Sequence, residues 1–264
     1  PGSYDRAQAL MRQARWQYSA YQLGLEQEGF ERLMNMWDLY RMALTDTMEA
    51  KGDSAPELLP PLYGMLHTQY LIAGYSGYST YPGYASAEGG TQLETRFTAY
   101  KSSSYKRGQA VLKAIYDVQE AQTGRGSPET AQILAQFGDW ALWHGKQDSA
   151  ITAYNDALAE LAARDDAQYE VGRLFGTPVP LPDLDGLRPL PRAAEVEGDQ
   201  QLVLQFDVTS GGRVRNLERL DENDLPDGKA NRLMRRVRST TFRPRFDMGE
   251  PVATESLIRA YDID

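Results

Sequence analysis

Cysteine is absent from the 264-residue sequence. This absence excludes disulfide bonds, thiolate metal sites and cysteine nucleophiles. Long apolar runs are missing as well, because no stretch reaches the roughly 18 residues that a helix needs to cross a bilayer. No secretory signal opens the chain, and its first three residues, Pro-Gly-Ser, are typical of a cloning remnant. The sequence therefore leaves open whether a signal peptide or membrane anchor was removed.

Histidine is scarce, and the two copies are His67 and His144. They stand at unlike positions of their expected helices, so we predict structural roles for both. The sequence has no His-Glu-x-x-His zinc motif, no phosphate-binding Gly-x-x-x-x-Gly-Lys loop and no Gly-x-Ser-x-Gly nucleophile turn. The acidic run 221–224 with Asp227 suggests calcium by composition, but its spacing does not fit the twelve-residue calcium loop. We therefore expect no enzyme, no cofactor and no metal site.

Basic residues are fewer than acidic ones, and the formal net charge is -9 at pH 7. The basic residues gather on one face of a single expected helix, at Lys229, Arg232, Arg235, Arg236 and Arg238. An acidic protein with one such face is not expected to bind nucleic acid. We interpret the basic face as a solvated helix surface.

A strand, turn, strand, helix, strand order is indicated between Gln201 and Ile263. Apolar residues alternate with polar ones from Leu202 to Val208, which is typical of a half-buried strand. The glycines of Thr-Ser-Gly-Gly at 209–212 supply the positive φ angles that a tight hairpin needs before the next strand begins at Val214. The following helix is predicted from an apolar stripe with i, i+3, i+4, i+7 spacing. That stripe is Ala230, Leu233, Met234 and Val237, and a last extended segment is expected over about 252–263.

This order resembles the carboxy-terminal domain of the TonB energy-transducer family. The likeness rests on an ordered set of short pieces rather than on one motif. They are Phe206-Asp207-Val208, Gly212, Val214 with Asn216, Phe242-Arg-Pro-Arg, the Gly-x-Pro-Val of 249–252 and the final Tyr261-Asp-Ile. The resemblance implies that the last strand takes up a short segment of an outer-membrane receptor by strand addition. The edge implied here is Thr254, Glu255, Ser256, Leu257, Ile258, Arg259, Ala260 and Tyr261. The alternative is a plain sheet edge that Glu255 and Arg259 blunt.

Helical periodicity dominates the chain before this region. A segment with small and aromatic positions resembles one tetratricopeptide repeat, in which small residues let two antiparallel helices approach. Its residues are Leu134, Phe137, Gly138, Gly145, Ala150, Tyr154 and Ala157. Ser127 is expected to cap the first of these helices, with Pro128 at its first position, and Asp148 or Ser149 to cap the second.

Two stretches have the composition of loops or linkers. Residues 74–94 are rich in tyrosine, glycine and serine, including Tyr75, Tyr78, Tyr81 and Tyr84, and are predicted to be a loop or a contact surface. Residues 174–195 are rich in proline and are predicted to be a stiff connector, unless their apolar residues pin them to the helices. The predicted domains are therefore a helical one at 1–173, this connector, and a mixed one at 196–264.

The expected fold class is α followed by α+β, with tetratricopeptide-type helical hairpins ahead of a small ββαβ domain. The expected function is that of a non-enzymatic periplasmic adaptor, which binds a protein partner by strand addition within a TonB-like transport system of the cell envelope. Two alternatives stay open: an energy transducer whose membrane anchor was removed, and a regulatory subunit of an envelope enzyme. A sheet edge of this kind also permits two copies to pair as a homodimer.

Overall fold

The computed structural model describes residues 3–25, 29–76, 88–191, 193, 201–221 and 227–262, and for residues 88–94 and 227 it describes the backbone alone. The chain is α+β, being mostly helical with small sheets, so the coarse fold class is confirmed. It divides into two compact units, Pro1–Ile133 and Leu134–Asp264. Each unit is described by itself.

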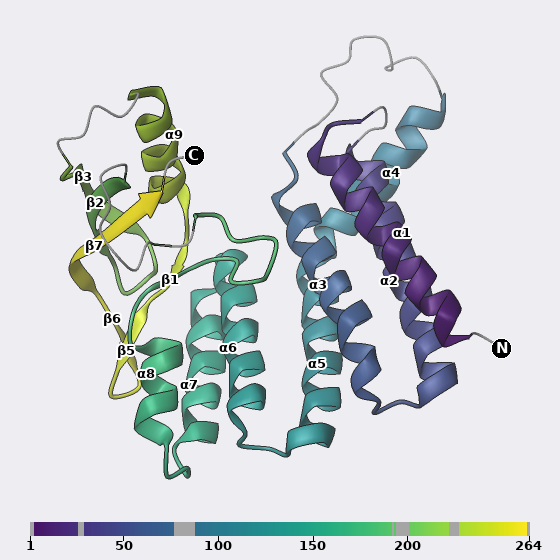
Figure 1. Cartoon of the computed structure of the whole chain (residues 1–264), viewed down its shortest axis with the longest axis horizontal. Helices are drawn as coiled ribbons and strands as arrows, with labels where there is room; N and C mark the ends of the chain where they lie inside the picture. The colour runs from purple at the N-terminus through teal and green to yellow at the C-terminus, as the bar shows by residue number, and fades with distance from the viewer. Residues whose placement is uncertain are drawn as a thin grey trace. The chain divides into compact units, whose positions relative to one another are not determined.

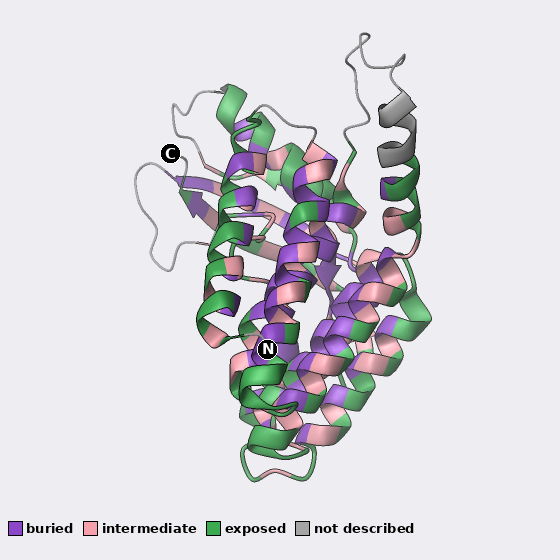
Figure 2. Cartoon of the chain, turned by 90° about the vertical axis from the view of Figure 1, so that its right-hand side faces the viewer, coloured by how far each residue is buried: buried purple, intermediate pink, exposed green. Residues whose placement is uncertain are grey.

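The first unit is built of helices that pack in sequence order. Helix α1 packs on α2, α2 on α3 and α3 on α5, and Figure 2 shows buried residues on the faces that these helices turn to one another. Ser3 caps α1 by accepting a hydrogen bond from the Arg6 N–H at 3.1 Å. The elements are α1 (Tyr4–Gln22), α2 (Gly29–Lys51), η1 (Pro56–Leu58), α3 (Leu59–Gly74), α4 (Glu88–Ser102) and α5 (Ser104–Thr123).

Three further helices follow, α6 (Pro128–Trp143), α7 (Gln147–Leu161) and α8 (Ala167–Phe175), and they run side by side in Figure 1. Gly138 on α6 faces the ring of Tyr154 on α7 so closely that a Cβ at position 138 would lie 2.2 Å from the ring. The close approach expected at this glycine is therefore present. Ser127 caps α6 as predicted, since its Oγ accepts from the Thr130 N–H at 3.1 Å.

The cap predicted for α7 is wrong. The helix begins at Gln147, so Asp148 lies inside its first turn and Lys146 occupies the cap position without a side-chain hydrogen bond. Gly145, with φ of +70°, makes the preceding turn as expected. An acidic residue within the first turn still favours the helix, because it complements the positive end of the helix dipole.

The sheet of the second unit has three strands in the order β3-β2-β7, all antiparallel. They are β2 (Gln201–Val208), β3 (Val214–Arg219) and β7 (Thr254–Asp262), and helix α9 (Asp227–Ser239) lies against one face of the sheet (Figure 1). The alternation predicted for β2 is confirmed, because Leu202, Leu204, Phe206 and Val208 are each 0% exposed. The predicted apolar stripe of α9 packs on them.

Short strands complete this unit. The extended segment expected at about 252–263 is present as β7, except that Val252 belongs to a separate strand, β6 (Glu250–Val252), which pairs with β5 (Arg245–Asp247). Strand β1 (Val179–Pro180) pairs with β4 (Phe242–Arg243). The ring of Phe246 on β5 lies 5.3 Å from that of Tyr154 and 5.2 Å from that of Phe175, which are 5.7 Å from each other, so β5 shares an aromatic cluster with α7 and α8.

The proline-rich stretch is packed where it is described. Leu181 is 0% exposed and Leu190 is 4% exposed, and the Leu181 N–H donates to the Thr241 carbonyl at 2.8 Å. These contacts join the stretch to Thr241 and to the core beneath the three-stranded sheet, so it is packed, but the predicted packing against the helices stays a prediction. The predicted boundaries 1–173, 174–195 and 196–264 follow composition and stay a prediction, whereas the compact units divide between Ile133 and Leu134.

The stretch predicted as a Tyr/Gly/Ser loop, 74–94, is described only at its ends. Residues 77–87, with Tyr78, Tyr81 and Tyr84, lie outside the described residues. Residues 88–94 are not loop but the first part of α4, which corrects that end of the prediction. Tyr75 is described, and its ring lies 5.3 Å from that of Phe97 on α4.

Candidate functional site: the outer edge of strand β7

All eight predicted binding residues lie on β7, the outermost strand of the three-stranded sheet on the side away from β3. Their side chains are not equally accessible. Ile258 is 55% exposed, and Glu255 and Ser256 are also exposed, whereas Tyr261 is 3% exposed and belongs to the hydrophobic core. The remaining four, Thr254, Leu257, Arg259 and Ala260, are half-buried.

The direction of the β7 backbone follows from its register with β2. Val203 uses both of its backbone groups toward β3: its N–H donates to Asp221 Oδ1 at 2.8 Å and its carbonyl accepts from the Leu220 N–H at 2.9 Å. Val203 stands opposite Ala260. Because backbone direction alternates along an antiparallel pair, Ala260 and Ile258 turn their N–H and C=O groups away from β2. These groups face the outer edge of the sheet.

A bulge limits this edge at its N-terminal end. The register steps from Phe206 to Val208 on β2 while β7 steps from Leu257 to Thr254, so β7 carries one extra residue. Ser256 has φ of +51° there. A bulge bends an edge strand and interrupts its ladder, which makes further pairing at that point unfavourable.

The carboxylate of Asp207 holds the bulge in place. It accepts the Ser256 backbone N–H at 2.8 Å and the Asn216 side-chain amide at 2.6 Å. These two hydrogen bonds stabilise the charged form and hold the pKa of Asp207 below its usual value. Asn216 also has a positive φ, of 49°, so one carboxylate secures an irregular residue on each neighbouring strand.

The C-terminal end of the same edge is partly occupied. Ala193 forms an antiparallel bridge with Tyr261. Arg259 donates from its guanidinium to the Pro178 carbonyl at 3.2 Å. The part of the edge that stays accessible among the described residues is therefore short, and it centres on Ile258.

A buried ion pair that the sequence did not reveal lies deeper in the second unit. Arg243 on β4 donates to both carboxylate oxygens of Asp139 on α6, at 2.8 and 2.6 Å, and to the Leu174 carbonyl at 3.0 Å. The two side chains are only 3% and 2% exposed. Tyr154 adds its hydroxyl to Asp139 at 2.9 Å. Burial alone would lower the pKa of Arg243, but the Asp139 carboxylate outweighs it and raises that pKa. The pair joins a helix and a strand 104 residues apart, so it is a structural element of the unit.

The two histidines pack against aromatic rings, and their structural role stays a prediction. His67 lies edge-on to Tyr18 with ring centroids 4.6 Å apart, and burial lowers its pKa to about 4. His144 packs against Trp140 at 4.4 Å, and burial together with the charge of Lys146 lowers its pKa. Both imidazoles are therefore neutral at pH 7.

The calcium candidate is described only in part. Residues 222–226 lie outside the described residues. Asp221 is engaged by Arg219 at 2.7 Å and by the Val203 N–H. Burial raises the pKa of Asp221, but the hydrogen bonds from Arg219 and Val203 lower it by more. Within the described ranges no group of three or more His, Cys, Asp or Glu residues could hold a metal ion.

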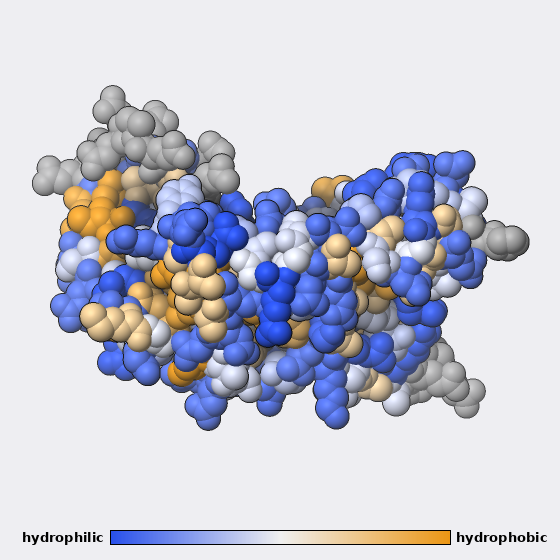
Figure 3. Space-filling view, turned by 90° about the horizontal axis from the view of Figure 1, so that it is seen from below, coloured by the Kyte–Doolittle hydropathy of each residue, from blue (hydrophilic) through white to orange (hydrophobic). Residues whose placement is uncertain are grey.

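On the face drawn in Figure 3, the hydrophobic residues among those that are coloured form groups between hydrophilic ones. Of the helices that the structure describes, none has both the length and the apolar character to cross a membrane.

Neither protein-family models, nor curated proteins, nor solved structures give a match to this chain. The likeness to the TonB carboxy-terminal domain and to a tetratricopeptide repeat therefore stays a prediction from the residues.

Proposed function

We propose that the chain is a non-enzymatic adaptor that holds an extended segment of a protein partner against the outer edge of β7. The observation that carries the proposal is the outward direction of the Ile258 backbone groups on a strand whose other edge pairs with β2. An exposed isoleucine at the same position supplies an apolar contact for the incoming segment.

The structure also sets the expected strength of this interaction. The bridge from Ala193 to Tyr261 occupies the outer edge next to Ala260, so an added strand has the two outward backbone groups of Ile258 for hydrogen bonds. A hydrogen bond contributes roughly 0.5–1.5 kcal/mol net, so the pair contributes about 1–3 kcal/mol. That is too little for a stable complex by itself. We therefore expect a transient interaction, or one strengthened by side-chain contacts of the partner with Ile258.

The finer parts of the proposal come from the residue resemblance. Two observations support it: β2, β3, α9 and β7 follow one another in this order, with the short strands β4, β5 and β6 between α9 and β7, and α6 and α7 approach closely at Gly138. On this basis we propose a role in the cell envelope, within a TonB-like transport system. An energy transducer with a membrane anchor ahead of Pro1 is the related alternative.

Substitution of Ile258 by proline tests strand addition directly. Proline lacks the N–H group and is tolerated on edge strands where that group faces outward, so I258P removes the outward donor without removing a hydrogen bond to β2. The matched control is I258T, which keeps the N–H and has good strand propensity. Each full-length variant is used to capture partners from envelope extract, and hydrogen exchange at position 258 in the control is measured with and without the captured partner.

We expect I258T to retain the partner and to show slower hydrogen exchange at position 258 in the complex. We expect I258P to lose the partner. Circular dichroism must show that both variants are folded. If folded I258P retains the same partner at the same yield, the partner is held elsewhere and strand addition at β7 is rejected.

A further inference from the structure

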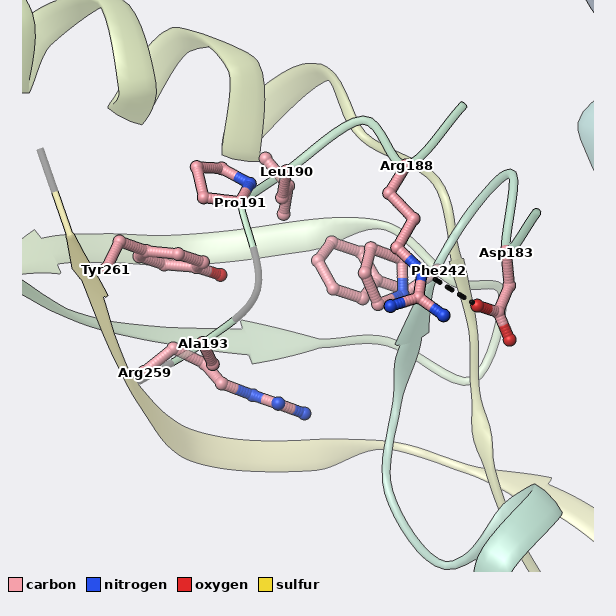
Figure 4. A pocket seen from close by; sticks show the side chains of 9 residues that line it. Asp183, Arg188, Leu190, Pro191, Ala193, Phe242, Arg259 and Tyr261 are labelled. Carbon is pink, nitrogen blue, oxygen red and sulfur yellow. Dashed lines mark ion pairs between the residues drawn. The ribbon is translucent and has the colours of Figure 1, made fainter. Parts of the chain in front are cut away.

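A small cavity lies beside the C-terminal half of β7, within the second unit. Its volume is about 220 Å³, and its apolar wall includes Leu190, Pro191 and the ring of Phe242 (Figure 4). Ligand sites for drug-sized molecules usually have about 300–1,000 Å³. The cavity therefore suits a small group, such as a single ring or one branched side chain with its head group.

Three hydrogen-bond donors converge on this cavity. Figure 4 shows the Tyr261 hydroxyl and the guanidinium groups of Arg188 and Arg259 pointing toward the same space. They come from two separate parts of the chain, Arg188 from the stretch after β1 and the other two from β7. Donors from distant segments that meet at an apolar wall are typical of a binding site rather than of a solvated surface.

Tyr261 is the most informative of the three. Only 3% of its surface is exposed, and its hydroxyl forms no hydrogen bond with any other described residue. Burial raises the pKa of this hydroxyl to about 12, so it keeps its proton at neutral pH and can donate it to a ligand. The hydroxyl lines the cavity, where a ligand acceptor can reach it.

The charges around the cavity favour an anion. Arg188 and Arg259 are opposed by one lining carboxylate, Asp183, which lies 3.6 Å from Arg188 and 3.8 Å from the buried Arg243. Asp185 is also 3.6 Å from Arg188, but it is fully exposed to water. Two cations against one anion leave the lining with a net positive charge. The distance of 3.6 Å is too long for a hydrogen bond, so the guanidinium of Arg188 keeps donors for a ligand.

We propose that this cavity binds a carboxylate that carries a short apolar or aromatic group, with the carboxylate on Arg188, Arg259 and Tyr261 and the apolar group against Phe242. Guanidinium groups match the planar carboxylate with paired donors, and the ring supplies the apolar contact. The ligand is either a free small acid or the C-terminal residue of a peptide, since both present this chemistry. The proposal does not depend on strand addition at Ile258.

Calorimetric titration of the full chain with phenylacetate and with an acetylated tetrapeptide ending in phenylalanine tests both sources. Phenylacetamide and the amidated tetrapeptide have nearly the same shape without the charge. We expect each amide to bind at least about tenfold more weakly than its acid, because hydrogen bonds to charged groups are stronger than neutral ones. Tighter binding of the tetrapeptide identifies a peptide terminus as the source, and tighter binding of phenylacetate identifies a free acid.

Three variants locate the binding in this cavity. Y261F removes only the hydroxyl and keeps the ring in the core, and R188Q alters an exposed side chain. Each should weaken the preferred acid by about threefold or more, and R259Q by about tenfold or more. R232Q, at an exposed position of α9 outside the cavity, is the matched control and should leave the affinity unchanged.

Equal binding of acid and amide overturns the proposal, as does unchanged affinity in folded Y261F and R259Q. Binding of inorganic phosphate at least as tight as that of phenylacetate overturns it too, because it would show an anion site without use of the apolar wall. I258P, which tests strand addition, should bind the small acid normally, so failure of one proposal can be told from failure of the other.

Discussion

The buried ion pair between Arg243 and Asp139 gives the sharpest prediction about stability. Substituting Arg243 with methionine leaves a group of similar length and no charge. Asp139 then stays buried with one hydrogen bond, from Tyr154, and the Leu174 carbonyl loses its donor.

The size of the effect follows from this burial. Removing one partner of a buried pair costs about 3–5 kcal/mol, because the remaining charge is left uncompensated. A domain of ordinary size is stable by about 5–15 kcal/mol. We therefore expect R243M to lose about 3–5 kcal/mol of unfolding free energy in the second unit, which is a large part of the total.

Urea unfolding followed by tryptophan fluorescence measures this loss. Trp140, beside Asp139 on α6 and 0% exposed, reports on the same unit. The control is a double-mutant cycle with D139L and the pair D139L/R243M. Replacing both charges with apolar groups is often nearly neutral, so the double variant should be more stable than either single one.

Two results would refute this reasoning. A loss of less than about 1 kcal/mol in R243M would show that water reaches Asp139 and that the pair is not buried in solution. Additive losses in the double variant would show that the two residues do not depend on each other.

Three further predictions concern single positions. G138A should destabilise the second unit by about 1–3 kcal/mol, because its Cβ would lie 2.2 Å from a tyrosine ring. The control is G172A on α8, where the Cβ would meet open space, and it should be neutral or stabilising. Thermal unfolding compares the two variants. His67 has a folded-state pKa of about 4 against an ordinary 6.5, so the unfolded chain binds its proton more tightly. The contribution of His67 to the free energy of unfolding should be complete above pH 6.5 and should fall by at most about 3 kcal/mol as the pH drops to 4. H67F should lack this pH dependence, and denaturant unfolding at several pH values tests both expectations. G212A should destabilise the sheet by more than about 2 kcal/mol, since φ is +76° and the Cβ would lie 2.0 Å from a backbone carbonyl oxygen; an equal midpoint in urea for both proteins would contradict this.

Local patterns were enough to predict several elements. Alternation from Leu202 to Val208 predicted β2 and its buried face, and the helical stripe from Ala230 to Val237 predicted α9. Ser127 predicted the start of α6, and Gly138 the close approach of two helices. These features depend on residues near one another in the sequence, where periodicity and capping act directly.

Tertiary structure decided what distant residues do. The pairing of Arg243 with Asp139, the bulge that Asp207 secures at Ser256, and the bridge from Ala193 to Tyr261 all join segments far apart in the chain. The resemblance implied that the last strand is an edge, but not that both of its ends are restricted, nor that the hydroxyl of its buried tyrosine points into a cavity. No local pattern records such contacts, because burial and register between strands are set only when the separate segments pack together.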